Sequence, residues 1–361
     1  MVPRVKTAGF RAIEIKQAYA QAERYPAGPL QNAACYLTSP AVAAEVQTVI
    51  AAEAPDLILI DAMFPAALAE AAQVDRPTAV ICHTFWFRHI DAWRQQMTRI
   101  ADLREQAGFS ALPGADQLWQ AHDRIVVTAL GAFDHSPLAG WEMVRHAGPV
   151  LEDEKCAVPT ALPWGDGDTT PLALISFSTG FEQRSLEKLQ RSLDALAELP
   201  LHVVATTGGI VNPQELAAPA NAVVLNYAAH DPILRRAALA VTHGGHGTAM
   251  RSLRHGVPMI LMPGLAHDQA PIAAIMEEWG TGRALAGDAA SATIRAAAQE
   301  ILSTPSFRDN ARRHAAALAG IDGAGNAADE VEALLEARSA AHNHRASRRI
   351  AAGAESMSRS R

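Results

Sequence analysis

The stretch HGGHGT at residues 243–248 decides the fold of this chain. It follows the apolar run ALAVT at residues 238–242, which is typical of a buried strand, and it precedes a segment with helical periodicity. Glycines let the backbone turn sharply and approach a ligand, and the first turn of a helix presents N–H groups and a positive dipole end. The sequence therefore predicts a strand–turn–helix unit that binds a diphosphate.

A second unit of the same kind follows further along the chain. The apolar run PMILM at residues 258–262 leads into PGLAHDQ at residues 263–269, which ends in a carboxylate and an amide. Open α/β sheets bind ligands at the carboxyl ends of their strands, so the two loops are expected to lie together. A diphosphate group at one loop and sugar hydroxyls at the other describe a nucleotide sugar.

Short apolar runs alternate with helical periodicity on both sides of a break in the pattern. Strands are expected at residues 57–60, 78–82, 125–130, 173–177, 202–206, 222–225, 239–242 and 259–262. This order predicts parallel sheets in an α/β fold. Residues 149–171 are rich in proline and glycine and are typical of a linker. We therefore expect two domains, at residues 1–148 and 172–337, and a basic disordered tail at residues 338–361.

The composition excludes several classes of protein. The 361 residues carry a formal net charge of −7, which argues against a nucleic-acid partner. Cys35, Cys82 and Cys156 are far apart, so neither a disulfide framework nor a zinc site is indicated. No apolar run approaches the roughly 18 residues of a membrane span, and no signal-peptide pattern is present. We expect a cytoplasmic protein without membrane insertion.

These segments resemble the UDP-glycosyltransferase superfamily, particularly bacterial enzymes that glycosylate secondary metabolites. The resemblance rests on SFSTG at residues 176–180, NYAAH at 226–230, VTHGGHGT at 241–248, GVPM at 256–259 and PGLAHDQ at 263–269. The first domain matches more loosely, through residues 55–61 and 82–83. The resemblance implies a GT-B fold, in which two Rossmann-like parallel-sheet domains face a cleft and bind the acceptor and the nucleotide sugar respectively.

The amino-terminal part departs from the family pattern. Members of the family begin with a strand, a loop that holds a Gly-His pair, a helix and a second strand, and then reach text similar to VKTAGF, which here occupies residues 5–10. The resemblance therefore implies a first domain truncated at its amino terminus, without the histidine that acts as general base. Such a chain is expected to bind a donor and to turn it over poorly.

The resemblance also implies roles in the donor site. It assigns the diphosphate to Ser178, Thr179, His243, Gly245, Gly247 and Thr248, the nucleotide base to Tyr227 and Ala228, and the sugar to Asp268 and Gln269. The donor is a UDP- or TDP-linked sugar, and no metal or other cofactor is expected, because the D-x-D sequence at residues 166–168 lies in the linker.

Ordinary structural roles remain open for several of these residues. Thr248 suits an N-cap as well as a phosphate contact. His246 suits a cap of the phosphate loop, and Tyr227 suits a core position. Asp268 and Gln269 suit an ordinary helix start.

Asp61 is the expected catalytic residue of the first domain. It ends an apolar strand, where the family has an acid that orients the catalytic histidine and stabilises its protonated form. The alternative for Asp61 is a cap of the helix that begins near Pro65. His83 is a candidate replacement base, against the alternative of a buried structural histidine. Residues 85–87 either wall an acceptor pocket or belong to an aromatic core.

The function expected from the resemblance is inverting transfer of a hexosyl group from a nucleoside-diphosphate sugar to a hydroxyl of a small apolar acceptor, a secondary metabolite. Negative charge grows on the leaving diphosphate, where His243 and the N–H groups of Gly247 and Thr248 are expected to receive it. Two alternatives stay open: a non-catalytic nucleotide-sugar-binding protein or degenerate partner subunit, and an epimerase of related architecture that acts on UDP-N-acetylglucosamine.

Overall fold

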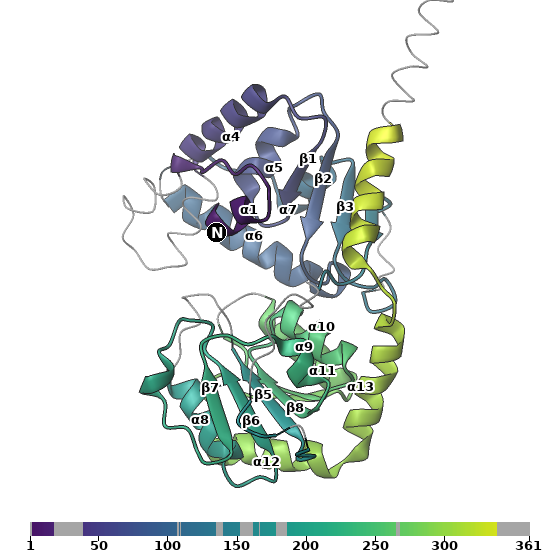
Figure 1. The fold of residues 1–361 in the computed structure, drawn as a ribbon. Helices are drawn as coiled ribbons and strands as arrows, with labels where there is room; N and C mark the ends of the chain where they lie inside the picture. Colours follow the sequence, from purple (N-terminus) through teal and green to yellow (C-terminus); the bar gives the residue numbers. More distant parts are fainter. Residues whose placement is uncertain are drawn as a thin grey trace, which may run out of the picture. The chain divides into compact units, whose positions relative to one another are not determined.

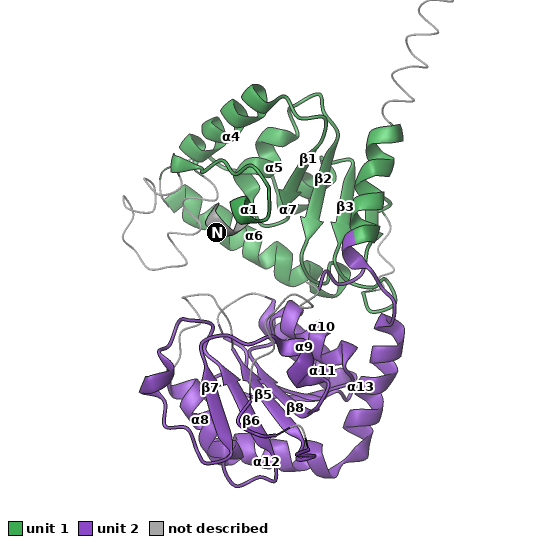
Figure 2. Ribbon diagram, viewed as in Figure 1, with its two compact units in different colours: residues 1–147, 325–361 green, residues 148–324 purple. Residues whose placement is uncertain are grey.

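The computed structural model describes residues 2–17, 39–106, 108, 110–134, 140–151, 162–165, 167–177, 186–264 and 268–337. The chain forms two compact units, which are residues 1–147 with 325–361 and residues 148–324 (Figure 2). Each unit contains a parallel sheet with helices packed against it (Figure 1). The α/β fold class expected from the sequence is therefore confirmed.

The sheet of the first unit has the strand order β1-β2-β3-β4. Its strands are β1 (Ile58–Asp61), β2 (Thr78–Cys82), β3 (Arg124–Val127) and β4 (Val144–His146), all parallel. In the register of β1 with β2, Asp61 lies opposite Ile81. The strands thus bring the residues that follow Asp61 and Cys82 to one edge of the sheet.

Helices lie around the sheet of the first unit (Figure 1). They are α1 (Val2–Thr7), α4 (Pro40–Glu53), α5 (Pro65–Ala71), the 3₁₀ turn η1 (Phe87–His89), α6 (Ile90–Gln106) and α7 (Ala115–Gln120). On α6 the buried side chains include Ile90, Trp93, Met97 and Ile100, which recur every three or four residues as a helix requires. In the last turn of α6, Arg104 is the buried residue and donates to Ser110, whereas Leu103 is only partly buried.

Trp86 is the centre of a tryptophan cluster in this unit. Its ring lies 4.9 Å from that of Trp119, 5.6 Å from that of Trp141 and 6.4 Å from that of Trp93. Phe85 and Trp86 are fully buried, so these two side chains belong to the aromatic core and do not wall an open acceptor pocket. The predicted alternative of an aromatic core is confirmed for them.

The second unit has a larger sheet, with the order β10-β9-β8-β5-β6-β7. Its parallel strands are β5 (Leu172–Ser176), β6 (His202–Thr206), β7 (Ala222–Leu225), β8 (Ala237–Thr242), β9 (Met259–Leu261) and β10 (Gly282–Ala284). The chain adds strands on one side of β5 and then returns to add the others on the opposite side. The switch therefore lies between β5 and β8, where open α/β sheets bind ligands.

The helices of this unit lie on both faces of the sheet (Figure 1). They are α8 (Leu186–Leu196), η4 (Pro213–Glu215), α9 (His230–Leu234), α10 (His246–Arg254), α11 (Gln269–Glu278), α12 (Ser291–Ser303) and α13 (Pro305–Leu318). The cluster beneath α8 and α12 joins Leu193 and Ile294 to Ile175, Val203 and Val241 of the strands. These apolar contacts fix the strands whose carboxyl ends carry the polar residues described below.

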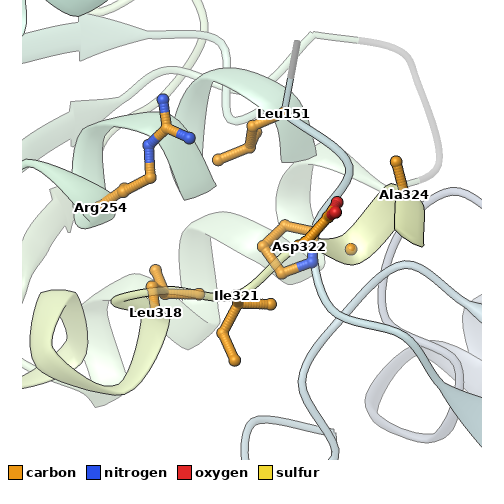
Figure 3. A pocket seen from close by; sticks show the side chains of 8 residues that line it. Leu151, Arg254, Leu318, Ile321, Asp322 and Ala324 are labelled. Atoms are coloured by element: carbon orange, nitrogen blue, oxygen red, sulfur yellow. The ribbon is translucent and has the colours of Figure 1, made fainter. Parts of the chain in front are cut away.

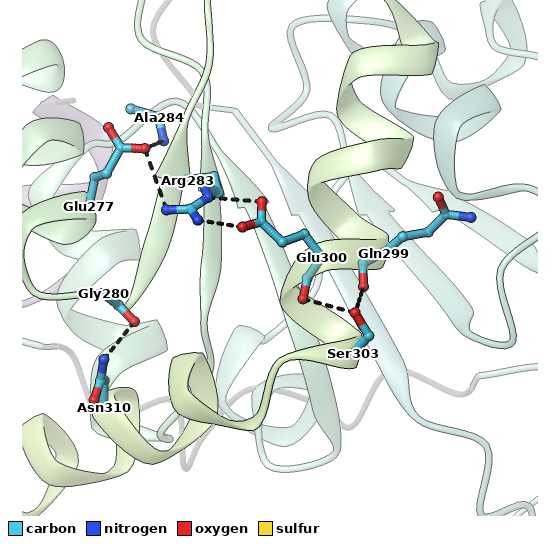
Figure 4. Close-up of polar contacts among 8 residues, drawn as sticks. All are labelled: Glu277, Gly280, Arg283, Ala284, Gln299, Glu300, Ser303 and Asn310. Atoms are coloured by element: carbon cyan, nitrogen blue, oxygen red, sulfur yellow. Dashed lines mark hydrogen bonds and ion pairs between the residues drawn. The ribbon is translucent and has the colours of Figure 1, made fainter.

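Two short edge strands, β4 and β10, were not expected from the sequence. Arg283 of β10 extends from the sheet to α12, where its Nε donates to Glu300 at 2.9 Å, and it lies 3.9 Å from Glu277 of α11 (Figure 4). Asn310 of α13 donates to the carbonyl of Gly280 just before the strand, at 3.1 Å. Side-chain contacts to neighbouring helices thus stabilise β10. The strand contains no apolar run from which it could be predicted.

The end of the described chain belongs to the first unit. A helix at residues 323–337 contains Glu330, whose carbonyl and carboxylate both accept from Arg124 of β3 at 2.7 Å. Asn326 donates to the carbonyl of Ala147 at 2.8 Å. The expected second domain, residues 172–337, is therefore corrected, because residues 325–337 pack with the first unit through contacts that sequence patterns do not reveal.

The segments that enter and leave the second unit lie next to each other. Leu151 and Pro149 line a cavity of about 50 Å³ together with residues 318–324 and Arg254 (Figure 3). This volume is far below the roughly 300 Å³ at which ligand pockets begin.

Among the described residues, no helix is long and apolar enough to cross a membrane.

Candidate functional site

The turn between β8 and α10 has the geometry of an anion cradle. Gly244 has a φ of 87°, a left-handed conformation that glycine adopts without strain. A Cβ on Gly245 would overlap the imidazole of His243, with Cε1 only 2.9 Å away. The absence of that side chain therefore lets the ring of His243 lie against the N-cap of α10.

The first turn of α10 directs its N–H groups toward the turn that holds the ring of His243. Its N-cap residue is Gly245, and the N–H of Ala249 makes the first helical bond, to the carbonyl of Gly245. The N–H groups of Gly247 and Thr248 precede that bond and point toward the helix N-terminus. Thr248 is thus inside the first turn, and its alternative role as N-cap is wrong.

Gly247 is exposed, and no atom of the residues that the structure describes lies within 4 Å of the place that its Cβ would occupy. A glycine inside a helix costs up to about 1 kcal/mol of stability relative to alanine. No close approach of the protein backbone accounts for this glycine. The open space over the helix start is therefore available to a ligand.

His243 is an uncharged hydrogen-bonding group at neutral pH. Burial is the main cause that lowers the pKa of His243 to about 4, with Lys188 lowering it further and Asp268 opposing the shift. Its Nδ1 lies 3.4 Å from the hydroxyl of Thr242. A phosphate oxygen at the cradle would accept a hydrogen bond from the ring and would favour its protonation.

Asp268 and Gln269 begin α11, the helix after β9. Asp268 is the N-cap residue, but its side chain makes no hydrogen bond to the N–H groups of the first turn. Its carboxylate therefore does not cap the start of the helix. Gln269 is buried, and its Oε1 accepts from the N–H of Gly264 at 2.6 Å. The carboxamide oxygen of Gln269 therefore holds the loop after β9, while the carboxylate of Asp268 acts on His243 electrostatically.

Polar and aromatic groups follow β5, β6 and β7 at the same edge of the sheet. Tyr227, two residues after the end of β7, is 65% exposed, so its alternative role in the core is wrong, whereas Ala228 is buried. The hydroxyl of Thr206 donates to that of Ser176 at 3.0 Å and lies 3.3 Å from Nε2 of His230. The sequence patterns did not single out this polar chain, because Ser176 and Thr206 are single residues at the ends of apolar strands and His230 begins α9.

Ser178 and Thr179, which were expected at the diphosphate, lie outside the described residues. The D-x-D sequence of the linker is described only in part. Asp168 accepts from Nε2 of His202 at 2.7 Å, and this bond is the main cause that holds the pKa of Asp168 well below its usual range. No group of three or more metal-ligating side chains occurs in the part of the chain that the structure describes.

A buried charge cluster anchors the cradle helix, and sequence reasoning missed it. Asp231 of α9 accepts from Arg251 and Arg254 of α10 and pairs with His255, each at 2.9 Å. Its side chain is only 6% exposed. Burial raises the pKa of Asp231, but His255 and the two arginines lower it more, so the net pKa lies below the usual value.

The first unit has its own polar pair at the carboxyl edge of its sheet. Oδ2 of Asp61 lies 3.4 Å from Nδ1 of His83, and the two side chains are 51% and 49% exposed. The alternative of a buried structural histidine is therefore wrong. Oδ1 of Asp61 accepts from the N–H of Met63 at 2.8 Å, whereas the N-cap residue of α5 is Phe64, so Asp61 does not cap that helix.

Residues 168–317 match the family model for UDP-glucoronosyl and UDP-glucosyl transferases. The PGL/p-HBAD biosynthesis glycosyltransferase of Mycobacterium tuberculosis is 33% identical over 182 residues, which are 50% of this chain and 41% of the relative. The oleandomycin glycosyltransferase of Streptomyces antibioticus is 34% identical over 170 residues, 46% of this chain and 39% of the relative. The NDP-glycosyltransferase YjiC of Bacillus licheniformis is 26% identical over 296 residues, which are 78% of this chain and 72% of the relative.

The chain spans between 41% and 42% of the length of the first curated relatives that it matches. Solved structures extend the likeness to both units. The calicheamicin glycosyltransferase CalG4 has a TM-score of 0.73 at 23% identity and covers 93% of this chain and 88% of its own. The glycosyltransferase SnogD from Streptomyces nogalater has a TM-score of 0.65 at 18% identity, and the match covers 92% of this chain and 89% of SnogD. Residues 168–317 are thus similar to the UDP-glucoronosyl and UDP-glucosyl transferase family, and the two parallel-sheet units have the GT-B fold of these glycosyltransferase structures.

Proposed function

We propose that this protein transfers a hexosyl group from a nucleoside-diphosphate sugar to a hydroxyl of a small apolar acceptor, with inversion at the anomeric carbon. The observation that carries the proposal is the start of α10, where the ring of His243 meets a helix N-terminus. Gly247 leaves open space above it. A diphosphate needs hydrogen-bond donors, a positive dipole end and close backbone approach, and this turn supplies all three.

The groups around the cradle suit the remaining parts of the donor. The exposed ring of Tyr227 presents an apolar face on which a nucleotide base can stack. Asp268 presents a carboxylate that accepts hydrogen bonds from sugar hydroxyls, beside the ring that donates to phosphate. We propose a UDP- or TDP-linked sugar as donor, with these residues at its two ends.

The same geometry favours departure of the diphosphate. When the bond to the anomeric carbon breaks, negative charge grows on the leaving phosphate oxygens. The donors at His243, Gly247 and Thr248 are already oriented and need no reorganisation, so they stabilise that charge in the transition state more than in the ground state. Relatives named for glycosylation of oleandomycin and of demethyllactenocin support a macrolide-type acceptor.

Replacement of His243 by alanine tests the proposal. We expect calorimetry on the full chain to give measurable binding of UDP or TDP, and His243→Ala to weaken it by about 1.5–3 kcal/mol, the range for a hydrogen bond to a charged acceptor. His314→Ala is a matched control, since that ring stacks on Trp279 at 4.4 Å and belongs to α13. Equal affinity in the wild type and the His243 variant would remove His243 from the site.

Replacement of Asp268 separates the sugar from the nucleotide. Asp268→Ala is expected to lower affinity for the nucleotide sugar by about 1–2 kcal/mol and to leave affinity for free UDP or TDP nearly unchanged, because the proposed hydrogen bonds of the carboxylate go to hydroxyls of the sugar and its effect on His243 is smaller than that of burial. Calorimetry with both ligands on one variant makes the comparison. If both ligands weaken equally, the carboxylate shapes the loop and does not contact the sugar.

A further inference from the structure

The side chains of Asp61 and His83 form a dyad at the ends of two neighbouring parallel strands. Asp61 is the last residue of β1, and His83 directly follows β2. The N–H of Ala62 donates to the carbonyl of Ile81 at 3.0 Å. The backbone hydrogen bonds between β1 and β2 therefore continue up to the two residues of the dyad. The backbone thus sets the approach of Oδ2 of Asp61 to Nδ1 of His83 at 3.4 Å.

Neighbouring groups fix the orientation of both members. The ring of His83 packs edge-on against Trp93, with centroids 5.8 Å apart and an interplanar angle of 86°. Trp93 is itself fully buried, and its Nε1 donates to the carbonyl of Phe85 at 2.9 Å. Because Oδ1 of Asp61 accepts from the N–H of Met63, only Oδ2 is directed at the imidazole.

The exposure of the pair argues against a purely structural role. About half of each side chain is accessible to solvent. Exposed ion pairs contribute little to stability, because water and salt screen them. An accessible imidazole that is oriented by a carboxylate through Nδ1 presents Nε2 as a proton acceptor, which is the arrangement that general-base catalysis requires.

We propose that His83 is the general base of the transfer reaction and that Asp61 is its positioning residue. This inference rests on the proposed function. Nε2 of His83 takes the proton of the acceptor hydroxyl while an oxygen electron pair forms the bond to the anomeric carbon. The bond from that carbon to the diphosphate oxygen breaks, and its electron pair leaves with the nucleoside diphosphate. His83 then releases its proton to water, so the products are the glycoside, the nucleoside diphosphate and one proton.

The acidity of the acceptor gives a readout that a structural role would not move. We would measure kcat/KM with 2-phenylethanol, phenol and 4-nitrophenol, using the glucose conjugate of whichever nucleotide the wild type binds. His83→Gln is expected to lower the rate with the alcohol by about 10²- to 10⁴-fold. The loss should shrink along the series, because 4-nitrophenol ionises without help from a base.

The pH dependence and the second residue complete the test. With the alcohol, the wild-type rate should rise with pH as an imidazole loses its proton, and His83→Gln should lose this rise. Asp61→Asn should lower the rate by a smaller factor, since the base remains but the charge that stabilises its protonated form is lost. Asp91→Asn is the matched control, because that carboxylate is 84% exposed on α6 and pairs only with Arg94 among the contacts described. Nucleotide affinity should be unchanged in all three variants.

The outcomes separate the inference from the proposed function. Equal rates and equal pH profiles for the wild type and His83→Gln, with intact nucleotide binding, would overturn the inference alone. An equal loss with all three acceptors would also overturn it, because a structural defect does not depend on acceptor acidity. A wild-type chain that binds neither UDP nor TDP and transfers to no acceptor would overturn both.

Discussion

Gly247→Ala is expected to make the second unit more stable and to remove most of its nucleotide affinity. The open space at this position accepts a methyl group without a clash, so the helix should gain roughly 0.5–1 kcal/mol. The Cα–Cβ bonds of a helix tilt toward its N-terminus, so the added methyl group points into the proposed diphosphate site. We expect binding of UDP or TDP to weaken by about 2–3 kcal/mol, or roughly 30- to 150-fold.

Thermal unfolding and calorimetry on the same variant measure the two opposite effects. Gly165→Ala is the matched control, since its Cβ would also meet no atom of the described part of the chain within 4 Å and it lies in the linker. That control should bind nucleotide as the wild type does. A Gly247→Ala variant that binds UDP and TDP with wild-type affinity would place the diphosphate away from the start of α10.

Asp231→Asn is expected to cause the largest loss of stability in the second unit. The substitution keeps the shape of the side chain but leaves Arg251, Arg254 and His255 around a buried position without their shared carboxylate. Removing one partner of a buried charge cluster costs about 3 kcal/mol or more. The midpoint of thermal unfolding should fall by roughly 6–12 °C. Asp309→Asn, an exposed position on α13, should show no change.

The stability difference between the wild type and Asp231→Asn should depend on pH. A carboxyl group whose pKa is lowered on folding contributes its stability above its unfolded pKa, about 3.9 for aspartate, and loses it as pH falls through the folded pKa. The difference in unfolding free energy should therefore be complete at pH 6–7 and should narrow below about pH 4. Denaturant titrations at pH 3, 4 and 7 measure it, and a difference that is the same at all three would exclude Asp231 as the charged partner.

The long apolar strands were predictable because their signal is local. Residues 78–82, 202–206 and 222–225 form strands over the expected ranges, since buried parallel strands are apolar on both faces. The expected strand at residues 125–130 ends at Val127 in the structure. β4 and β10 escaped prediction because three-residue edge strands need few apolar side chains, and side-chain bonds such as that of Arg283 to Glu300 hold β10.

The site was predictable only where its parts are contiguous in sequence. The turn at residues 243–248 combines a strand end, glycines and a helix start, so the sequence indicates an anion cradle directly. For Gln269, local sequence gave no sign that its carboxamide oxygen bonds to Gly264. The roles of Tyr227 and Asp268 at the donor stay predictions, although both residues lie in connections that follow strands of one sheet.

The sequence by itself determined that this protein has two parallel α/β units and a glycine-rich turn that leads from a strand into a helix, because backbone conformation and apolar periodicity are properties of neighbouring residues. Only the tertiary structure decided which distant side chains meet. It joins Asp61 to His83, Asp231 to the far end of α10, and Glu330 to Arg124. Such pairs depend on strand order and helix packing, which set distances between residues that no local pattern connects.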